Sequence, residues 1–353
     1  MADYNIKQYD RIVGVGAAGL GYLFKLIDNH TLGREESRRA IQLDSKDFCK
    51  MHIIMHYIAK LAGIKSYPVT SVGSDDNGEY ILRTMRDAGM DTSFVKTVSD
   101  TFTTCGFSYL YPDGTGGNIS PINGATSNIS REEILAIIRG LPAVGARELL
   151  LVCPEIPVEL RLALLEEGRR RGSYNIASFT SSEAREFETG FKNVDLLAIN
   201  EDEAFALIGE SIEIRDEKDC RETTKRCVKK LRELKSGCDV IITFGEHGCC
   251  VCSSGVERYH KALQADRVST AGAGDAMLAG TVVGLINGLP LDDDNGEEEL
   301  SSASDLGRVI ASLSIESSDT INFDIDIEAI AGYIESKSLK PTTEWLEAAL
   351  NQK

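Results

Sequence analysis

A run of small residues that ends in an aspartate carries the strongest chemical signal in the chain. Residues 269–275 read Ser-Thr-Ala-Gly-Ala-Gly-Asp and lead into an apolar stretch typical of a helix. Small residues at a helix start let backbone N–H groups approach an anion closely, and the helix dipole adds positive charge there. The Asp275 carboxylate follows directly and could take a proton from a hydroxyl, as phosphoryl transfer to an alcohol requires. The alternative is a tight strand-to-helix turn in which Asp275 only caps the helix.

An amide and a carboxylate follow another strand-like run upstream. Asn200 and Glu203 come directly after the apolar stretch Asp195–Ile199, at the predicted start of a helix. Their spacing lets both side chains point toward one water-rich site, where an amide and a carboxylate suit hydrated Mg²⁺. The same Asn-x-x-Glu pattern is also the signature of a helix capping box, so by itself it does not indicate a metal.

A glycine-containing turn ends the predicted strand Val240–Thr243. The hydroxyl of Thr243 and the glycines at Gly245 and Gly248 would let this turn lie against a flat or anionic ligand. The alternative is an ordinary hairpin turn, because the residues around Val251 continue as a strand.

A second glycine pattern offers a competing function. Residues 14–19 form a full Gly-x-Gly-x-x-Gly after a predicted strand over 10–16, and Asp44 ends a later strand-like run. These are the parts of a dinucleotide-binding unit of an NAD(P)-dependent oxidoreductase. Residues 29–33 interrupt any crossover helix, however, and Asp44 comes late for the usual spacing.

The elements around these motifs alternate between helix and strand. Apolar spacing predicts helices over 47–63, 131–140, 157–171, 216–236 and 275–288, separated by short apolar strands. This alternation predicts a single α/β domain over 1–353 with a doubly wound, mostly parallel sheet, and ligands at the carboxyl ends of its strands. Segments near 20–45 and 93–118 show a different, two-sided pattern and are expected to form a small β-sheet lid.

Composition excludes several classes of partner. The 353 residues carry a formal net charge of -17, which argues against nucleic-acid and anionic-membrane partners. No apolar run has the length of a membrane span, and the polar start lacks the form of a signal peptide, so a cytoplasmic protein is expected. The nine cysteines are an odd number and are expected to be reduced.

Taken together, the motifs resemble those of the ribokinase/PfkB family of carbohydrate and nucleoside kinases. The resemblance covers most of residues 10–320 and includes Val72–Gly78 and Ala88–Thr92. It implies ATP and Mg²⁺ as cofactors and a doubly wound sheet with a β lid. By this resemblance, Asp275 would be the base, and the N–H groups of Gly272, Ala273 and Gly274 would form an anion hole. Mg²⁺ would be bound near Asn200 and Glu203, and ATP near Thr243, Gly245 and Gly248.

The acceptor-binding half departs from the family pattern. The aspartate that usually ends the first strand aligns with Gly21, and the Gly-Gly-x-x-x-Asn sugar-binding motif falls on Cys49–Ile54, where it is absent. The aspartate that opens the family signature is Ser269. Without a carboxylate and an amide to bind two neighbouring hydroxyls of the acceptor, the site loses hydrogen bonds that are important in a pocket that excludes water.

The sequence therefore predicts an ATP-dependent kinase that phosphorylates a hydroxyl of a sugar, sugar phosphate, nucleoside or similar polyol. A catalytically impaired, nucleotide-binding regulator on the same fold is the alternative, because the acceptor residues are missing. The NAD(P)-dependent oxidoreductase is the third interpretation. Pairing of lid edges would make the protein a homodimer.

Overall fold

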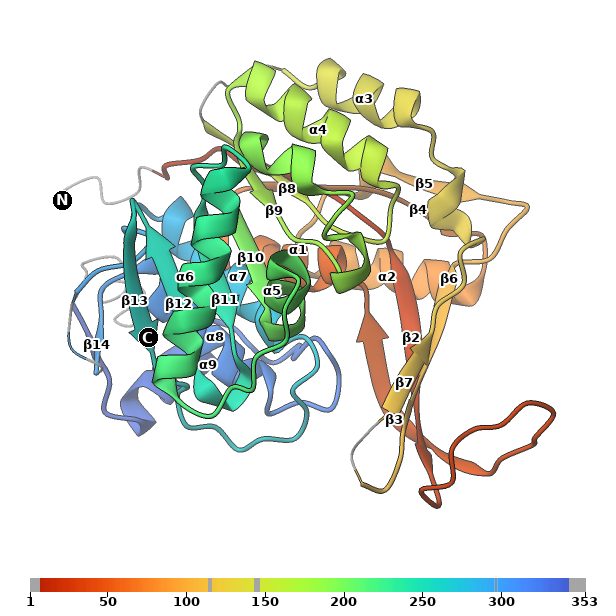
Figure 1. Ribbon diagram of the computed structural model, residues 1–353. Helices are drawn as coiled ribbons and strands as arrows, with labels where there is room; N and C mark the ends of the chain where they lie inside the picture. Colours follow the sequence, from red (N-terminus) through yellow and green to blue (C-terminus); the bar gives the residue numbers. More distant parts are fainter. Residues whose placement is uncertain (1–6, 114–115, 143–146, 295, 297, 343–353) are drawn as a thin grey trace.

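A nine-stranded, mostly parallel sheet forms the centre of the molecule (Figure 1). The computed structural model describes residues 7–113, 116–142, 147–294, 296 and 298–342. In the part it describes, the strands β12 and β13 form an antiparallel hairpin at one edge, and the others pair in parallel. In spatial order they are β13 (Val256–His260), β12 (Cys249–Ser253), β11 (Asp239–Thr243), β10 (Leu196–Asn200), β9 (Tyr174–Ala177), β8 (Glu148–Val152), β1 (Arg11–Val15), β4 (Lys65–Gly73) and β5 (Val95–Val98).

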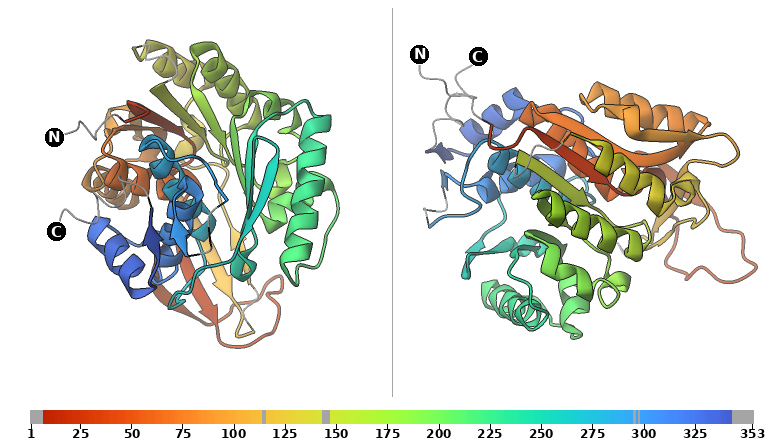
Figure 2. Two further views of the ribbon diagram at one scale, coloured as in Figure 1. Left: turned by 90° about the vertical axis from the view of Figure 1, so that its left-hand side faces the viewer. Right: turned by 90° about the horizontal axis from the view of Figure 1, so that it is seen from above.

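Helices cover both faces of this sheet, as the right-hand view in Figure 2 shows. Successive strand residues point to opposite faces, so Ile12 and Val13 of β1 are both fully buried but belong to two separate apolar cores. One core contains α1 (Lys50–Ala62), α2 (Asp76–Asp87), α7 (Ala273–Ile286), α8 (Ala303–Ser314) and α9 (Ile327–Ser336). The other contains α3 (Arg131–Gly140), α4 (Val158–Arg171), α5 (Glu201–Ile208) and α6 (Glu217–Glu233). The predicted doubly wound sheet is confirmed.

A separate four-stranded sheet extends from the main body at the lower right of Figure 1. Its order is β3 (Ala40–Phe48), β2 (Gly19–Leu26), β6 (Thr104–Leu110) and β7 (Gly116–Ile119). Most strand residues in the two segments expected to form a lid lie in this sheet. Residues 114 and 115 of that prediction lie outside the described residues, as do the ends 1–6 and 343–353 of the predicted domain.

One part of the predicted lid belongs to the main sheet instead. The strand β5, within the segment 93–118, pairs in parallel with β4. The predicted helix over 47–63 also begins later, at Lys50, because Asp47 and Phe48 end the strand β3 and pair with β2. Phe48 looked like part of the helix's apolar face, but it is a strand residue that packs against His52 and Tyr80.

The dinucleotide interpretation is wrong. Its glycine motif should open a helix, but Gly19 begins the strand β2, and Asp44 lies within β3 of the small sheet. The glycines serve close packing instead: a Cβ at Gly16 would lie 2.7 Å from the Cβ of Met51 in α1. The glycines therefore allow the first strand to pack closely against α1, and they do not form a binding site for a pyrophosphate.

Two helices near the end of the chain, α8 and α9, were not predicted. The helix α8 packs along α7, where a Cβ at Gly280 would lie 2.8 Å from the Cα of Gly307. This close approach buries α7, which was predicted, on nearly every side. A further pair of short strands, β14 (Glu299–Leu300) and β15 (Lys340–Pro341), lies beside them.

The nine cysteines are free thiols in the structure, in agreement with the expectation that they are reduced. Cys249, Cys250 and Cys252 of β12 are buried in the cores rather than gathered as a metal site. Among the described residues we find no helix that combines the length and the apolar character needed to cross a lipid bilayer.

Candidate active site

One pocket of about 950 Å³ collects the predicted site residues at the carboxyl ends of the central strands. The strands β10 and β11 pair in register, so their last residues, Asn200 and Thr243, lie side by side at its wall. The start of α7 faces them. All nine residues singled out in the sequence line this pocket: Asn200, Glu203, Thr243, Gly245, Gly248, Gly272, Ala273, Gly274 and Asp275.

The turn before α7 depends on a glycine. Gly272 is the N-cap, with a φ of 81° that favours glycine, and a Cβ there would lie 2.5 Å from the carbonyl oxygen of Thr320. The N–H of Ala273 donates to the carbonyl of Thr270 at 3.3 Å, so this amide already has a partner. The N–H groups of Gly274 and Asp275 follow in the first turn, where the helix offers no acceptor. The free end of the helix therefore points these amides toward the pocket.

Asp275 has the protonation behaviour expected of a general base. Desolvation raises the pKa of its carboxyl from 3.8 to about 7, and the negative charges of Glu203, Glu155 and Asp47 act in the same direction. The positive charge of Lys50 lowers this pKa and so opposes the shift. The Asp275 residue keeps partial access to the pocket although protein surrounds its carboxyl. A carboxylate with a pKa near neutrality can accept a proton under physiological conditions.

Lys50 is a pocket residue that the sequence did not single out. It is the first residue of α1, and its Nζ lies 2.6 Å from the Oε1 of Glu203. Burial alone lowers the pKa of Lys50, but the carboxylates of Asp275 and Glu203 raise it overall above its ordinary value, so the side chain is a cation. The sequence shows only that Lys50 lies in the Cys49–Ile54 segment, because its partner Glu203 is distant in the chain.

Asn200 and Glu203 form the capping box that was the alternative to a metal site. The Oδ1 of Asn200 accepts from the N–H of Glu203 at 2.8 Å, and the Oε2 of Glu203 accepts from the N–H of Asn200 at 2.9 Å. With its other oxygen on Lys50, the Glu203 carboxylate is fully engaged. No group of three metal-ligating side chains occurs among the described residues. The chemistry present thus fits Mg²⁺ that is held mainly by phosphate oxygens and water, with the Asn200 amide at its edge.

The turn after β11 is both a hairpin and a wall of the pocket. Thr243 pairs with Cys249 across the antiparallel strands β11 and β12, and the N–H of Phe244 donates to the carbonyl of Gly248 at 2.8 Å. A Cβ at Gly245 would meet nothing within 4 Å, so this position opens onto free space. The expected hairpin therefore leaves room for a ligand beside the Thr243 hydroxyl.

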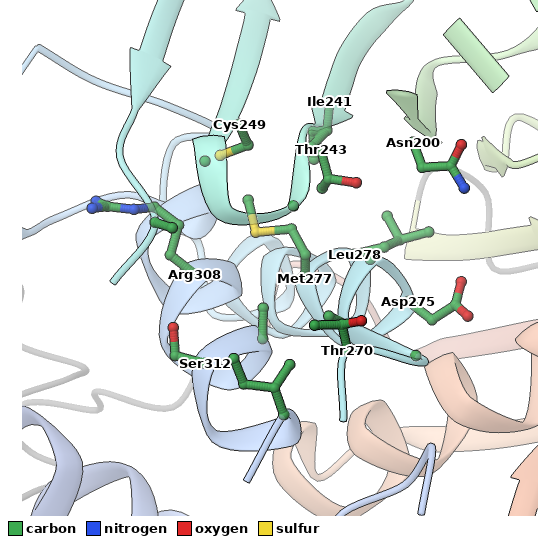
Figure 3. A pocket seen from close by; sticks show the side chains of 18 of the residues that line it. Asn200, Ile241, Thr243, Cys249, Thr270, Asp275, Met277, Leu278, Arg308 and Ser312 are labelled. Carbon is green, nitrogen blue, oxygen red and sulfur yellow. The ribbon is translucent and has the colours of Figure 1, made fainter. Parts of the chain in front are cut away.

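Figure 3 shows the side chains that line the two ends of the pocket. Cys249, Arg308 and Ser312 lie toward one end, and Asn200 and Asp275 lie toward the other. An elongated ligand with its reactive group at the Asp275 end would therefore lie along the hairpin turn.

Comparison with known proteins gives a consistent family. A model described as the pfkB family carbohydrate kinase matches residues 54–327. The ribokinase of Staphylococcus aureus (strain COL) is 22% identical over 249 residues, which cover 70% of this chain and 75% of that protein. The inositol 3-kinase of Arabidopsis thaliana is 32% identical over 95 residues, 27% of this chain and 24% of that protein.

Solved structures with the same fold cover nearly the whole chain. The structure of Arabidopsis thaliana ribokinase complexed with ribose and ATP has a TM-score of 0.71 at 20% identity, and the similarity covers 93% of this chain and 99% of that chain. Ribokinase from Giardia lamblia has a TM-score of 0.72 at 17% identity, over 92% and 99% of the two chains. At sequence identities this low, the structural similarity establishes the fold alone.

Proposed function

Because the chain belongs to the pfkB family of carbohydrate kinases, we propose that it transfers the γ-phosphoryl group of ATP to a hydroxyl of a sugar, nucleoside or similar small polyol. The observation that carries this proposal is the start of α7. There, Asp275, with a carboxyl pKa of about 7, follows amides that have no acceptor within the helix. A base beside an anion cradle is what transfer of a phosphoryl group to an alcohol needs.

In the proposed reaction, Asp275 accepts the proton of the acceptor hydroxyl as its oxygen attacks the γ-phosphorus. The bond from phosphorus to the β,γ-bridging oxygen breaks, and ADP leaves with that electron pair. The N–H groups of Gly274 and Asp275 stabilise the negative charge that spreads over the transferred group. The glycine at position 272 sets the turn that exposes these amides, and Ala273 holds the turn through its bond to Thr270.

We assign the nucleotide to the hairpin side of the pocket. Thr243 offers a hydroxyl and Gly245 open space there, while Gly248 closes the turn against the backbone of His260. Similarity to a ribokinase complexed with ribose and ATP supports ATP as the donor. Mg²⁺ bound with the nucleotide would supply positive charge to its phosphate oxygens. Asn200 would hold water around that ion, and Glu203 would fix Asn200 and Lys50 in place.

The catalytically impaired regulator remains the second candidate. It is favoured by the absence of a side chain at Gly21 and by the sequence of Cys49–Ile54, which lacks the family's acceptor motif. The two functions differ in turnover and agree in ATP binding, so one experiment separates them.

The small sheet is proposed to act as a lid and as the contact of a homodimer. Phe107 and Ile119 pair across β6 and β7, so they lie on the same face of this sheet, and their side chains are 47% and 63% exposed. Light scattering of the wild type and of Phe107→Glu would distinguish dimer from monomer.

The central test is phosphoryl transfer by the wild type and by Asp275→Asn. We expect the wild type to convert ATP to ADP with at least one uncharged polyol from a panel of sugars, nucleosides and inositols. The asparagine variant should bind ATP with nearly unchanged affinity by calorimetry and turn over at least about a thousandfold more slowly, because its base is gone. ATP binding without transfer to any acceptor would favour the regulator, and an unchanged rate in Asp275→Asn would exclude Asp275 as the base.

A further inference from the structure

A carboxylate of the small sheet lies across the position where a neighbouring strand has no side chain. Gly21 of β2 pairs with Asp47 of β3. A Cβ built on Gly21 would lie 2.8 Å from the Cβ of Asp47 and 3.2 Å from its Oδ2. The Asp47 side chain therefore fills the space beside the bare backbone of Gly21, and only a residue without a side chain fits opposite it.

This carboxylate has few partners for its position. The Asp47 residue is only partly exposed, and burial raises the pKa of its carboxyl. Within the described residues its carboxylate accepts one hydrogen bond, from the Oγ of Ser108 on β6 at 3.5 Å, which is the outer limit of such a bond. A carboxylate can accept several hydrogen bonds, so Asp47 keeps unused acceptor capacity.

Asp47 also leads directly into the wall of the active site. The chain continues through Cys49, the N-cap of α1, to Lys50, whose Nζ reaches Glu203 at 2.6 Å. The negative charge of Asp47 is close enough to contribute to the raised pKa of Asp275. Asp47 is not itself among the residues that line the pocket; it lies three residues before the pocket residue Lys50, on the strand that runs into α1.

We propose that Asp47 binds the phosphoryl acceptor by accepting hydrogen bonds from its hydroxyl groups, with Gly21 providing the room. This inference rests on the proposed kinase function and deepens it by naming the acceptor class. Asp47 and Glu155 add negative charge around the base, and Glu203 already neutralises Lys50. An uncharged or cationic polyol fits such a space, and a phosphorylated or carboxylated acceptor is repelled.

The pairing of Gly21 with Asp47 allows the carboxylate to be moved from one strand to the other. We would measure kcat/KM for ribose, myo-inositol, adenosine and ribose 5-phosphate in the wild type, Asp47→Gly, Gly21→Asp and the double variant Gly21→Asp/Asp47→Gly. Asp47→Gly should lower kcat/KM for the best uncharged acceptor by about 100-fold through KM, as expected for hydrogen bonds to a charged group. Gly21→Asp alone should also lower it, because two carboxylates then compete for one space.

The double variant should recover kcat/KM to within about tenfold of the wild type, because the carboxylate returns to the same space. A protein that is merely damaged by either change would not be rescued by both. Asp47→Asn keeps the shape without the charge and should lose about tenfold. Asp44→Asn, an exposed position on the same strand, serves as the matched control and should change nothing.

ATP affinity and acceptor-induced thermal stabilisation of each variant separate the two proposals. If the wild type binds a polyol through Asp47 but transfers no phosphate, the kinase proposal fails and the role of Asp47 stands. If the wild type phosphorylates a polyol and Asp47→Gly keeps its KM, the role of Asp47 is overturned and the kinase remains. Preference for ribose 5-phosphate over ribose would also overturn the acceptor class.

Discussion

Replacing Asp275 by asparagine should make the protein more stable while it removes the activity. The folded state holds this carboxyl in surroundings that raise its pKa from 3.8 to about 7. Ionising it there costs about 4 kcal/mol relative to the unfolded chain. Because the group keeps access to water in the pocket, we expect about half of this, ~2 kcal/mol, to appear as a gain in Asp275→Asn at pH 8.

The sign of the effect fixes its pH dependence. The folded state binds the Asp275 proton more tightly than the unfolded state, so the stabilisation by this proton is fully present below pH 3.8. It is lost as the pH rises through about 7. The advantage of Asp275→Asn should therefore be full at pH 8 and shrink below about 1 kcal/mol at pH 5.

Urea unfolding of both proteins at several values between pH 5 and 8, followed by circular dichroism, measures this difference directly. Asp324→Asn, at an exposed carboxylate away from the pocket, should leave the free energy of unfolding unchanged across the range. An Asp275→Asn protein that is no more stable than the wild type at pH 8 would refute a destabilising carboxylate at this position. So would a gain that does not vary with pH.

Three further changes test other parts of the site and core. Gly272→Ala should lower the free energy of unfolding by about 2 kcal/mol or more in urea, because its φ of 81° disfavours alanine and a carbonyl oxygen lies 2.5 Å from the new methyl group. Lys50→Met should raise the pKa of Asp275 and shift the rising limb of the pH–rate profile by about one pH unit toward alkaline values. An unmoved limb would show that the charge of Lys50 does not affect the ionisation of Asp275. His52 and His56 are buried, and burial lowers the pKa of each to about 3. Their unfolded forms take up protons below about pH 6.5, so each histidine should lower stability by about 2 kcal/mol between pH 7 and 5, and His52→Leu should decline by about 2 kcal/mol less than the wild type over this range.

The main sheet could be predicted because its strands follow simple rules. Short apolar runs such as Val240–Thr243 end at polar residues and alternate with helical patterns, which indicates a parallel sheet whatever the details of packing. The helix α7 could be recognised from the Gly-Ala-Gly-Asp turn that opens it, although burial on nearly every side removes its amphipathic period. The strand β5 was assigned to the wrong sheet because its few residues show no pattern that separates an edge strand of the main sheet from a lid strand.

The two walls of the site differ in how far the sequence predicts them. The turn residues around Gly272 and Thr243 could be recognised because tight turns at strand ends need particular residue types. The position of Asp47 could not be recognised, because its significance depends on the register that sets it opposite Gly21. Lys50 was missed for a related reason: its partner, Glu203, is distant in sequence and meets it only in the folded chain.

The pocket draws its walls from segments far apart in the chain. The residues proposed to bind ATP and carry the phosphoryl transfer follow residue 195, whereas the pocket residue Lys50 precedes residue 65, as do Gly21 and Asp47, which are proposed to hold the acceptor. No strand or helix is shared between these two sets. Substitutions that change the contacts to the acceptor can therefore accumulate during evolution outside the strands and helices of the phosphoryl-donor side, which gives this scaffold a ready route to new substrates.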